Sequence, residues 1–162
     1  MAAMRYQTNS PFPGDPTKSL EFAVGVLTSV GFRLVDRTSQ TVEMTGPGFR
    51  SSNENPLRGA STIRITHHGG ELALDAELGG VEWMGKFVTW FPNILAVTLG
   101  VVLSIVFWTL WGPGRWLTVL VIVIAADGMM WLMLGPYITR KLKERTQREL
   151  ETLLANAATM GR

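Results

Sequence analysis

One ionisable residue lies inside an apolar stretch, where a charge is costly. Asp127 is the sole acidic residue between positions 91 and 136, near the middle of the apolar segment 116–137. An ionised carboxylate at the centre of a bilayer costs about 2.5–3.5 kcal/mol on insertion scales. Three interpretations compete. Asp127 bonds to a donor on another subunit, or it is a protonated carboxyl bonded to a local hydroxyl or carbonyl, or it carries protons or ions. The first is our working hypothesis.

Small and hydroxyl residues accompany Asp127 in the two apolar segments. Counting equally from the turn at 112–115 places Gly100 opposite Asp127. Gly128 permits close approach of two helices, and Ser104 supplies a hydroxyl near the same depth. We therefore predict an intramembrane interaction site formed by Asp127, Gly100, Ser104 and Gly128.

The remaining polar groups do not form a recognisable active site. His67 and His68 are adjacent, so on a strand they point to opposite faces and cannot share one metal ion. Asp75 and Glu77 are expected to pair with Arg64 across strands. The sequence has no cysteine, which excludes thiol catalysis and cysteine-ligated zinc. We expect no catalytic, cofactor or metal site, and a protein that is not an enzyme.

Two segments have the length and composition of membrane spans. Residues 92–111 and 116–137 are each about 20 residues long, enough to cross a hydrocarbon core of about 30 Å. The short Gly- and Pro-containing link 112–115 makes them antiparallel neighbours, with the link as an external turn. Aromatic residues near the ends are predicted to be interfacial anchors: Trp83, Trp90, Trp108, Trp111, Trp116, Trp131 and Tyr137.

Basic residues follow the second span and predict its orientation. The positive-inside rule places this flank, and with it both termini, in the cytoplasm of a bacterial inner-membrane type of protein. Residues 138–162 are expected to form a basic amphipathic helix that also suits anionic lipid headgroups. Its apolar stripe could dock on the protein's own domain or on a partner. Because the basic charge lies in a tail, nucleic acid is not an expected partner. The flank consists of Arg140, Lys141, Lys143, Arg145 and Arg148.

The N-terminal part predicts a small α+β domain over 15–80, after a flexible arm at 1–14. Asp15 suits a helix N-cap, and Gly31 suits the residue after the helix end. Four later segments alternate apolar and polar residues, as half-buried strands do. We expect a two-layer cytoplasmic domain, with one helix on a four-stranded antiparallel sheet. An interfacial linker at 81–91 would join it to the hairpin. Whether the loop 49–60 is ordered is left open.

These features together predict a non-catalytic accessory subunit of a larger inner-membrane complex. The hairpin would dock on other integral membrane subunits, and the soluble domain would cap the cytoplasmic face. A respiratory or photosynthetic assembly is a natural host on general grounds. Two alternatives remain open. One is a small homo-oligomeric channel or proton-linked transporter centred on Asp127, and the other is a membrane-tethered cytoplasmic binding module.

Overall fold

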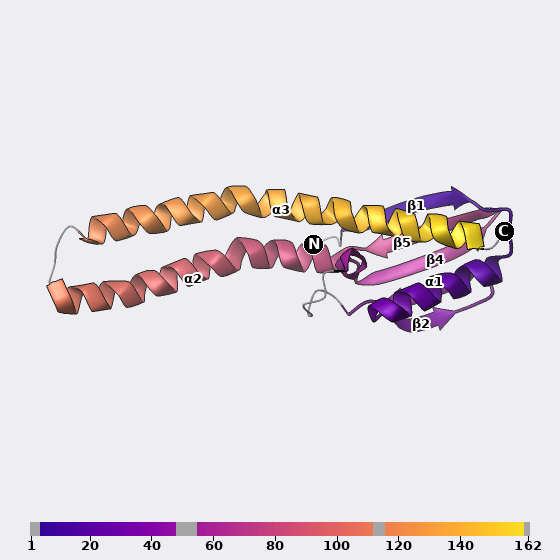
Figure 1. Ribbon diagram of the computed structural model, residues 1–162, viewed down its shortest axis with the longest axis horizontal. Helices are drawn as coiled ribbons and strands as arrows, with labels where there is room; N and C mark the ends of the chain where they lie inside the picture. Colours follow the sequence, from indigo (N-terminus) through magenta and orange to yellow (C-terminus); the bar gives the residue numbers. More distant parts are fainter. Residues whose placement is uncertain (1–3, 48–54, 112–115, 161–162) are drawn as a thin grey trace. The chain divides into compact units, whose positions relative to one another are not determined.

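The computed structural model describes residues 4–47, 55–111 and 116–160 (Figure 1). The chain divides into two compact units. One unit combines the residues up to Trp83 with those from Lys141 onward, and the other is Met84–Arg140. The elements are β1 (Arg5–Pro11), α1 (Pro16–Val30), β2 (Arg33–Arg37), β3 (Thr41–Thr45), the 3-10 helix η1 (Pro56–Gly59), β4 (Thr62–His68), β5 (Glu71–Glu77), α2 (Gly79–Trp111) and α3 (Trp116–Met160).

The first unit is built on an antiparallel sheet with the strand order β1-β5-β4-β3-β2. The α+β class is confirmed, but the predicted four-stranded sheet is wrong, because the sheet has five strands. The additional strand is β1, which lies within the expected N-terminal arm 1–14. Its inward positions include Thr8 and Ser10, which lie opposite Leu74 and Leu72. Since these inward residues are polar, the strand lacks the apolar alternation that marks the others.

Helix α1 begins and ends where its capping residues predict. The Asp15 carboxylate accepts a hydrogen bond of 2.9 Å from the Thr17 amide, and Pro16 occupies the first helical position. Gly31 closes the helix with φ +100°, a left-handed conformation that costs glycine little. The helix buries Leu20 and Leu27 in the core beside the sheet.

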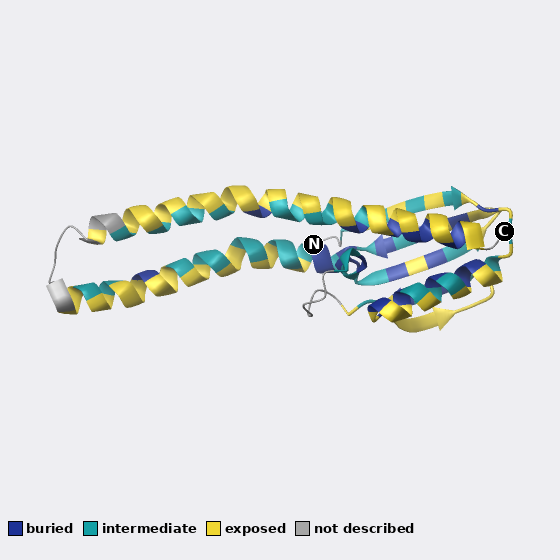
Figure 2. Ribbon diagram, viewed as in Figure 1, coloured by how far each residue is buried: buried dark blue, intermediate teal, exposed yellow. Residues whose placement is uncertain are grey.

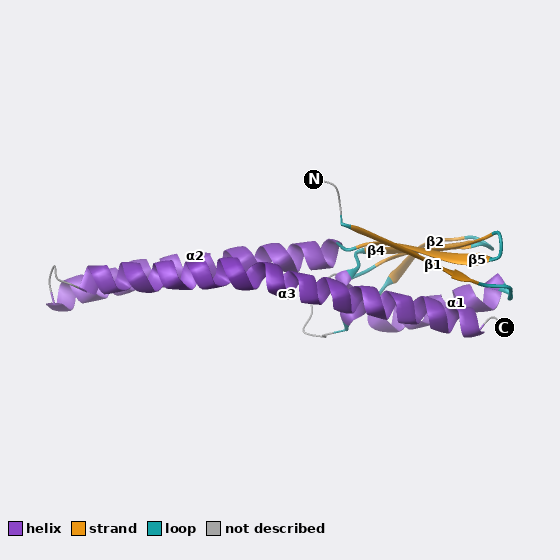
Figure 3. Cartoon of the chain, turned by 90° about the horizontal axis from the view of Figure 1, so that it is seen from above, coloured by secondary structure: helices purple, strands orange, loops and turns teal. Residues whose placement is uncertain are grey.

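The last part of α3 completes the same core. Leu150, Leu153, Leu154 and Ala157 are buried in one cluster with α1 and the inner side of the sheet. Figure 2 shows buried positions along the end of α3 in dark blue, and Figure 3 shows α1 and the end of α3 on one side of the sheet. The Tyr6 hydroxyl of β1 donates a hydrogen bond to Glu151 of α3. The apolar stripe of this helix therefore docks on the protein's own domain.

The 3-10 helix η1 joins α1 to α3. The Arg58 guanidinium donates two hydrogen bonds, of 3.2 and 3.0 Å, to the Val30 carbonyl at the end of α1. The buried Thr146 hydroxyl of α3 donates a hydrogen bond of 3.0 Å to the Pro56 carbonyl. Residues 55–60 of the loop 49–60 are thus ordered, whereas 49–54 lie outside the described residues.

Replacement of Tyr6 tests the contact between β1 and α3. Burial, and then the hydrogen bond to Glu151, raise the pKa of Tyr6 above its ordinary value. A group with a raised folded-state pKa stabilises the fold fully below its unfolded pKa, here about 10, and this stability is lost as the pH rises through the folded-state pKa. We expect Tyr6→Phe to flatten this alkaline loss and to cost about 0.5–1.5 kcal/mol at pH 7 for the missing hydrogen bond.

The measurement is the melting temperature in detergent from pH 7 to beyond the tyrosine range. Tyr137→Phe provides the matched control, because Tyr137 is exposed and is the second of the two tyrosines in the sequence. Its alkaline profile should equal that of the unmodified protein. An unchanged alkaline profile in Tyr6→Phe would show that the contact with Glu151 does not stabilise the fold.

Candidate functional site

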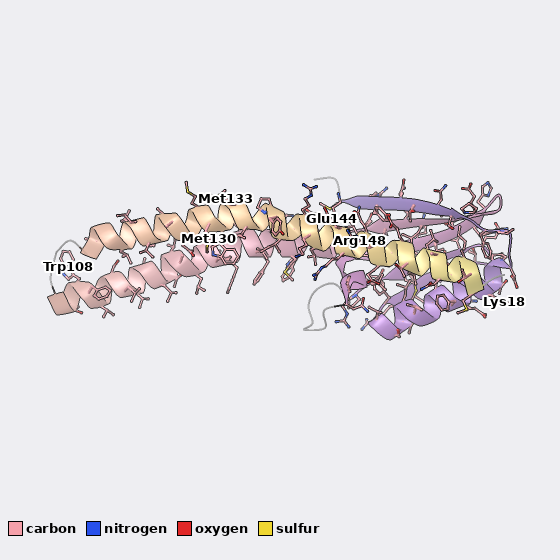
Figure 4. The ribbon with its side chains drawn as sticks, turned by 45° about the horizontal axis from the view of Figure 1, so that its top comes forward. Lys18, Trp108, Met130, Met133, Glu144 and Arg148 are labelled. Atoms are coloured by element: carbon pink, nitrogen blue, oxygen red, sulfur yellow. The ribbon has the colours of Figure 1, made fainter. Side chains whose placement is uncertain are left out.

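Two helices are long and apolar enough to cross a membrane. The qualifying stretches are Gly79–Thr109, with mean hydropathy 2.0, and Leu120–Met160, with mean hydropathy 1.7. In each, 6% of the apolar window is buried, so the apolar windows themselves are not packed into a core. Their apolar side chains are instead exposed, among them Trp108 of α2 and Met130 and Met133 of α3 (Figure 4). The expected linker 81–91 forms part of the continuous helix α2.

Glycines bring α2 and α3 together within Met84–Arg140. A Cβ atom added at Gly100 would lie 2.4 Å from Ile124 Cδ1, and one at Gly128 would lie 3.2 Å from Asn93 Oδ1. Such distances show that each glycine accepts a side chain of the opposite helix, which permits close packing. The same relation holds for Gly85 with Thr139 and for Gly135 with Thr89.

The helix register differs from the one that equal counting gives. Gly100 packs against Ile124, which is three residues, or about 4.5 Å of helix rise, from Asp127. Equal counting assumes two helices without an offset. In the structure, the two helices are instead aligned so that each of these glycines faces a larger side chain of the opposite helix. Gly100 and Asp127 still line the same groove.

The hydroxyl groups near Asp127 are bonded to their own helix. The Ser104 hydroxyl donates a hydrogen bond of 2.7 Å to the Gly100 carbonyl, and Thr98 donates one of 2.8 Å to Ile94. Ser104 therefore does not serve Asp127 as a donor here. Sequence reasoning missed Asn93, which donates a 2.6 Å bond to the Thr89 carbonyl and faces Gly128. The sequence feature that could have identified Asn93 is its amide side chain inside an apolar segment. Its position near the start of that segment resembles a span boundary.

An open apolar groove of about 540 Å³ runs along the hairpin. Its α2 side extends from Phe87 to Leu103, and its α3 side from Leu120 to Trp131. Asp127 is the one ionisable residue in this lining. Within the described part of the chain, no side chain donates a hydrogen bond or forms an ion pair with its carboxylate. The groove thus presents a half-buried carboxylate in otherwise apolar surroundings.

Aromatic rings lie at one end of this groove. The rings of Phe87 and Phe91 stack with centroids 4.8 Å apart, and both line the groove. Trp131, four residues after Asp127, lines it from α3. Trp131 was predicted as an interfacial anchor, and it is partly buried here.

The other predicted anchors and basic residues, except Lys143, occupy exposed positions where they are described. Trp83, Trp90, Trp108 and Tyr137 are exposed, as are Arg140, Lys141, Arg145 and Arg148, whereas Lys143 is partly buried. The turn 112–115 and the side chains of Trp111 and Trp116 lie outside the described residues.

Polar residues of the sheet are engaged in structural contacts. The His67 ring meets Phe12 edge-on at 5.8 Å. Arg64 pairs with Glu43, which raises the pKa of the guanidinium, and Gln7 donates a hydrogen bond of 3.1 Å to Asp75. Glu77 pairs with Arg5 at 3.2 Å. Among the described residues, no three His, Asp or Glu side chains are grouped so that they could hold a metal ion.

Comparisons with protein-family models, with curated proteins and with solved structures each give no match for this chain.

Proposed function

We propose that this protein is a non-catalytic accessory subunit of a larger inner-membrane complex. Its hairpin docks on other integral membrane subunits, and its α+β domain caps the cytoplasmic face. The observation that carries the proposal is Asp127, a carboxylate without a donor among the described residues, in an open apolar groove. A buried or membrane-embedded charge requires a partner, and the exposed groove leaves room for one from another chain.

The first unit combines residues that precede the hairpin with residues that follow it, which supports two passes through the membrane. Residues before α2 and residues after Lys141 belong to one compact unit and share one core. A hairpin that crosses a bilayer twice returns the chain to the side from which it started, and a shared core is compatible with that arrangement. The basic residues that follow the second apolar stretch favour the cytoplasm for that side.

Replacing Asp127 tests the proposal. We expect Asp127→Asn to insert and fold, because it keeps the shape of the side chain, but to lose association with its partners by about tenfold or more. The expected size follows from a hydrogen bond to a charged group, worth about 1.5–3 kcal/mol. The measurement is purification from native membranes in mild detergent on a C-terminal tag, with mass spectrometry of the intact complexes.

Met129→Leu is the matched control, because Met129 is exposed on the same helix and does not line the groove. It should recover the same set of partner subunits, in fixed stoichiometry, as the unmodified chain. Normal assembly of both Asp127→Asn and Asp127→Leu would refute a bond from Asp127 to a partner. Recovery of this chain alone, as a defined homo-oligomer, would refute the accessory role and favour the channel or transporter.

A further inference from the structure

An ionised carboxylate in the groove calls for a cation rather than a neutral donor. A hydroxyl or amide would bond to the Asp127 carboxylate but leave its net charge in apolar surroundings. A lysine or arginine would neutralise the charge as well as donate hydrogen bonds. The nearby hydroxyls of Ser104 and Thr98 are already bonded to carbonyls of α2.

The aromatic residues of the groove favour the same chemistry. Trp131 follows Asp127 by four residues, so the two side chains lie on one face of α3, and both line the groove. Phe91 lines it from α2. The ring faces of tryptophan and phenylalanine attract cations, and the methylene stem of lysine or arginine packs well on apolar walls.

The length of the groove indicates a helix as its occupant. The α2 wall consists of residues at three- and four-residue spacing between Phe87 and Leu103, a rise of about 24 Å. A volume of about 540 Å³ spread over that length suits a row of side chains better than one compact molecule. A helix lying along the hairpin presents such a row.

The sequence argues against a second copy of this chain as the occupant. Between Lys86 and Arg140, the one basic residue is Arg115. It lies 12 residues from Asp127, or about 18 Å along a helix. A second copy, parallel or antiparallel, therefore brings no cation to the level of Asp127.

We infer that the groove holds a transmembrane helix of a different chain, which places one lysine or arginine against Asp127 on the side of Trp131 and Phe91. This inference rests on the proposed function and names the chemistry of its partner. The partner helix binds through an ion pair that neutralises Asp127 in the membrane. Cation–π contacts and side chains packed along α2 add to this interaction.

The test uses the purified full chain in lipid nanodiscs with designed Leu/Ala helices that carry one central lysine, glutamine or glutamate. The chain has no cysteine, so Ala155→Cys, at an exposed position, accepts a single dye for energy transfer to a labelled helix. We expect the lysine helix to bind at least tenfold more tightly than the glutamine helix. Asp127→Asn should remove this preference, and Trp131→Leu should weaken it several-fold. Met133→Leu, outside the groove, should keep it.

Charge reversal separates loss of the ion pair from loss of folding. Asp127→Lys should reject the lysine helix and bind the glutamate helix, which a misfolded variant would not do. Equal binding of the lysine and glutamine helices by the unmodified chain would overturn the inference. So would self-association that depends on Asp127, or displacement of the helix by an equimolar short-chain quaternary ammonium.

The outcomes of this test are separable from those of the proposed function. Equal binding of the helices, together with a complete set of native partners, would leave the accessory role intact and assign Asp127 a neutral donor. Selective binding of the lysine helix, with no native partner subunit recovered, would uphold the site and refute the accessory role.

Discussion

Leu150→Ala is expected to lower the free energy of unfolding of the α+β unit by about 2–5 kcal/mol, the range for deleting a buried leucine side chain. Leu150 is fully buried, at 0% exposure, in the cluster that α1, the sheet and the end of α3 share. The cavity that alanine leaves there has well-packed walls and cannot collapse completely. Urea unfolding in detergent, followed by circular dichroism, measures the change.

The control for this substitution is Leu34→Ala on the edge strand β2. Leu34 is 49% exposed, so the same truncation there should cost less than about 1 kcal/mol. The comparison tests whether the end of α3 packs on the protein's own domain or is exposed to bind a partner. If Leu150→Ala unfolded no more easily than Leu34→Ala, the end of α3 would not belong to this core in solution.

Gly59→Ala is the second substitution with a large expected effect. A Cβ atom at Gly59 would lie 2.2 Å from Thr146 Oγ1 and 2.9 Å from Thr146 Cγ2. Thr146 is fully buried and bonded to the Pro56 carbonyl, so its side chain has little freedom to move. Overpacking of this kind typically costs about 1–3 kcal/mol. We expect a loss in that range in the same urea experiment.

Two further variants make this expectation specific. Gly25→Ala is the matched control, because the Cβ there meets nothing within 4 Å and α1 should gain about 0.5–1 kcal/mol. Thr146→Ala removes the atoms that block Gly59, at the cost of one hydrogen bond. The Gly59→Ala/Thr146→Ala pair should therefore lose less stability than the sum of the single variants. Strict additivity would show that Thr146 is not the obstacle.

The sequence predicted the structure best where a residue type has one well-defined structural role. Asp15, Pro16 and Gly31 delimit α1 through capping and a left-handed φ, and those requirements are local. The alternation of strands β3 to β5 follows from one buried side, which also depends on neighbours along the chain. By contrast, β1 is held by backbone pairing with β5 and carries polar inward residues, so no alternation marked it.

For the candidate site, the sequence revealed the charge but not its surroundings. Asp127 is conspicuous because the apolar segment makes a carboxylate costly there. The offset between α2 and α3 depends on how Gly128 and Gly100 accept Asn93 and Ile124, which no count along the chain contains. The groove is lined by residues of two helices, so it could be predicted only if the register between these helices were known.

The shared core of the α+β unit also constrains the order of events during synthesis. The segment from Leu150 to Ala158, which fills part of that core, leaves the ribosome after every strand, after α2 and after the first part of α3. Until then, α1 covers the apolar side of the nascent sheet without the end of α3. A chain released early, or cut after residue 140, would keep that side partly open and offer it to chaperones and proteases. The interior of the α+β unit is therefore complete only after residues 150–158 have been made.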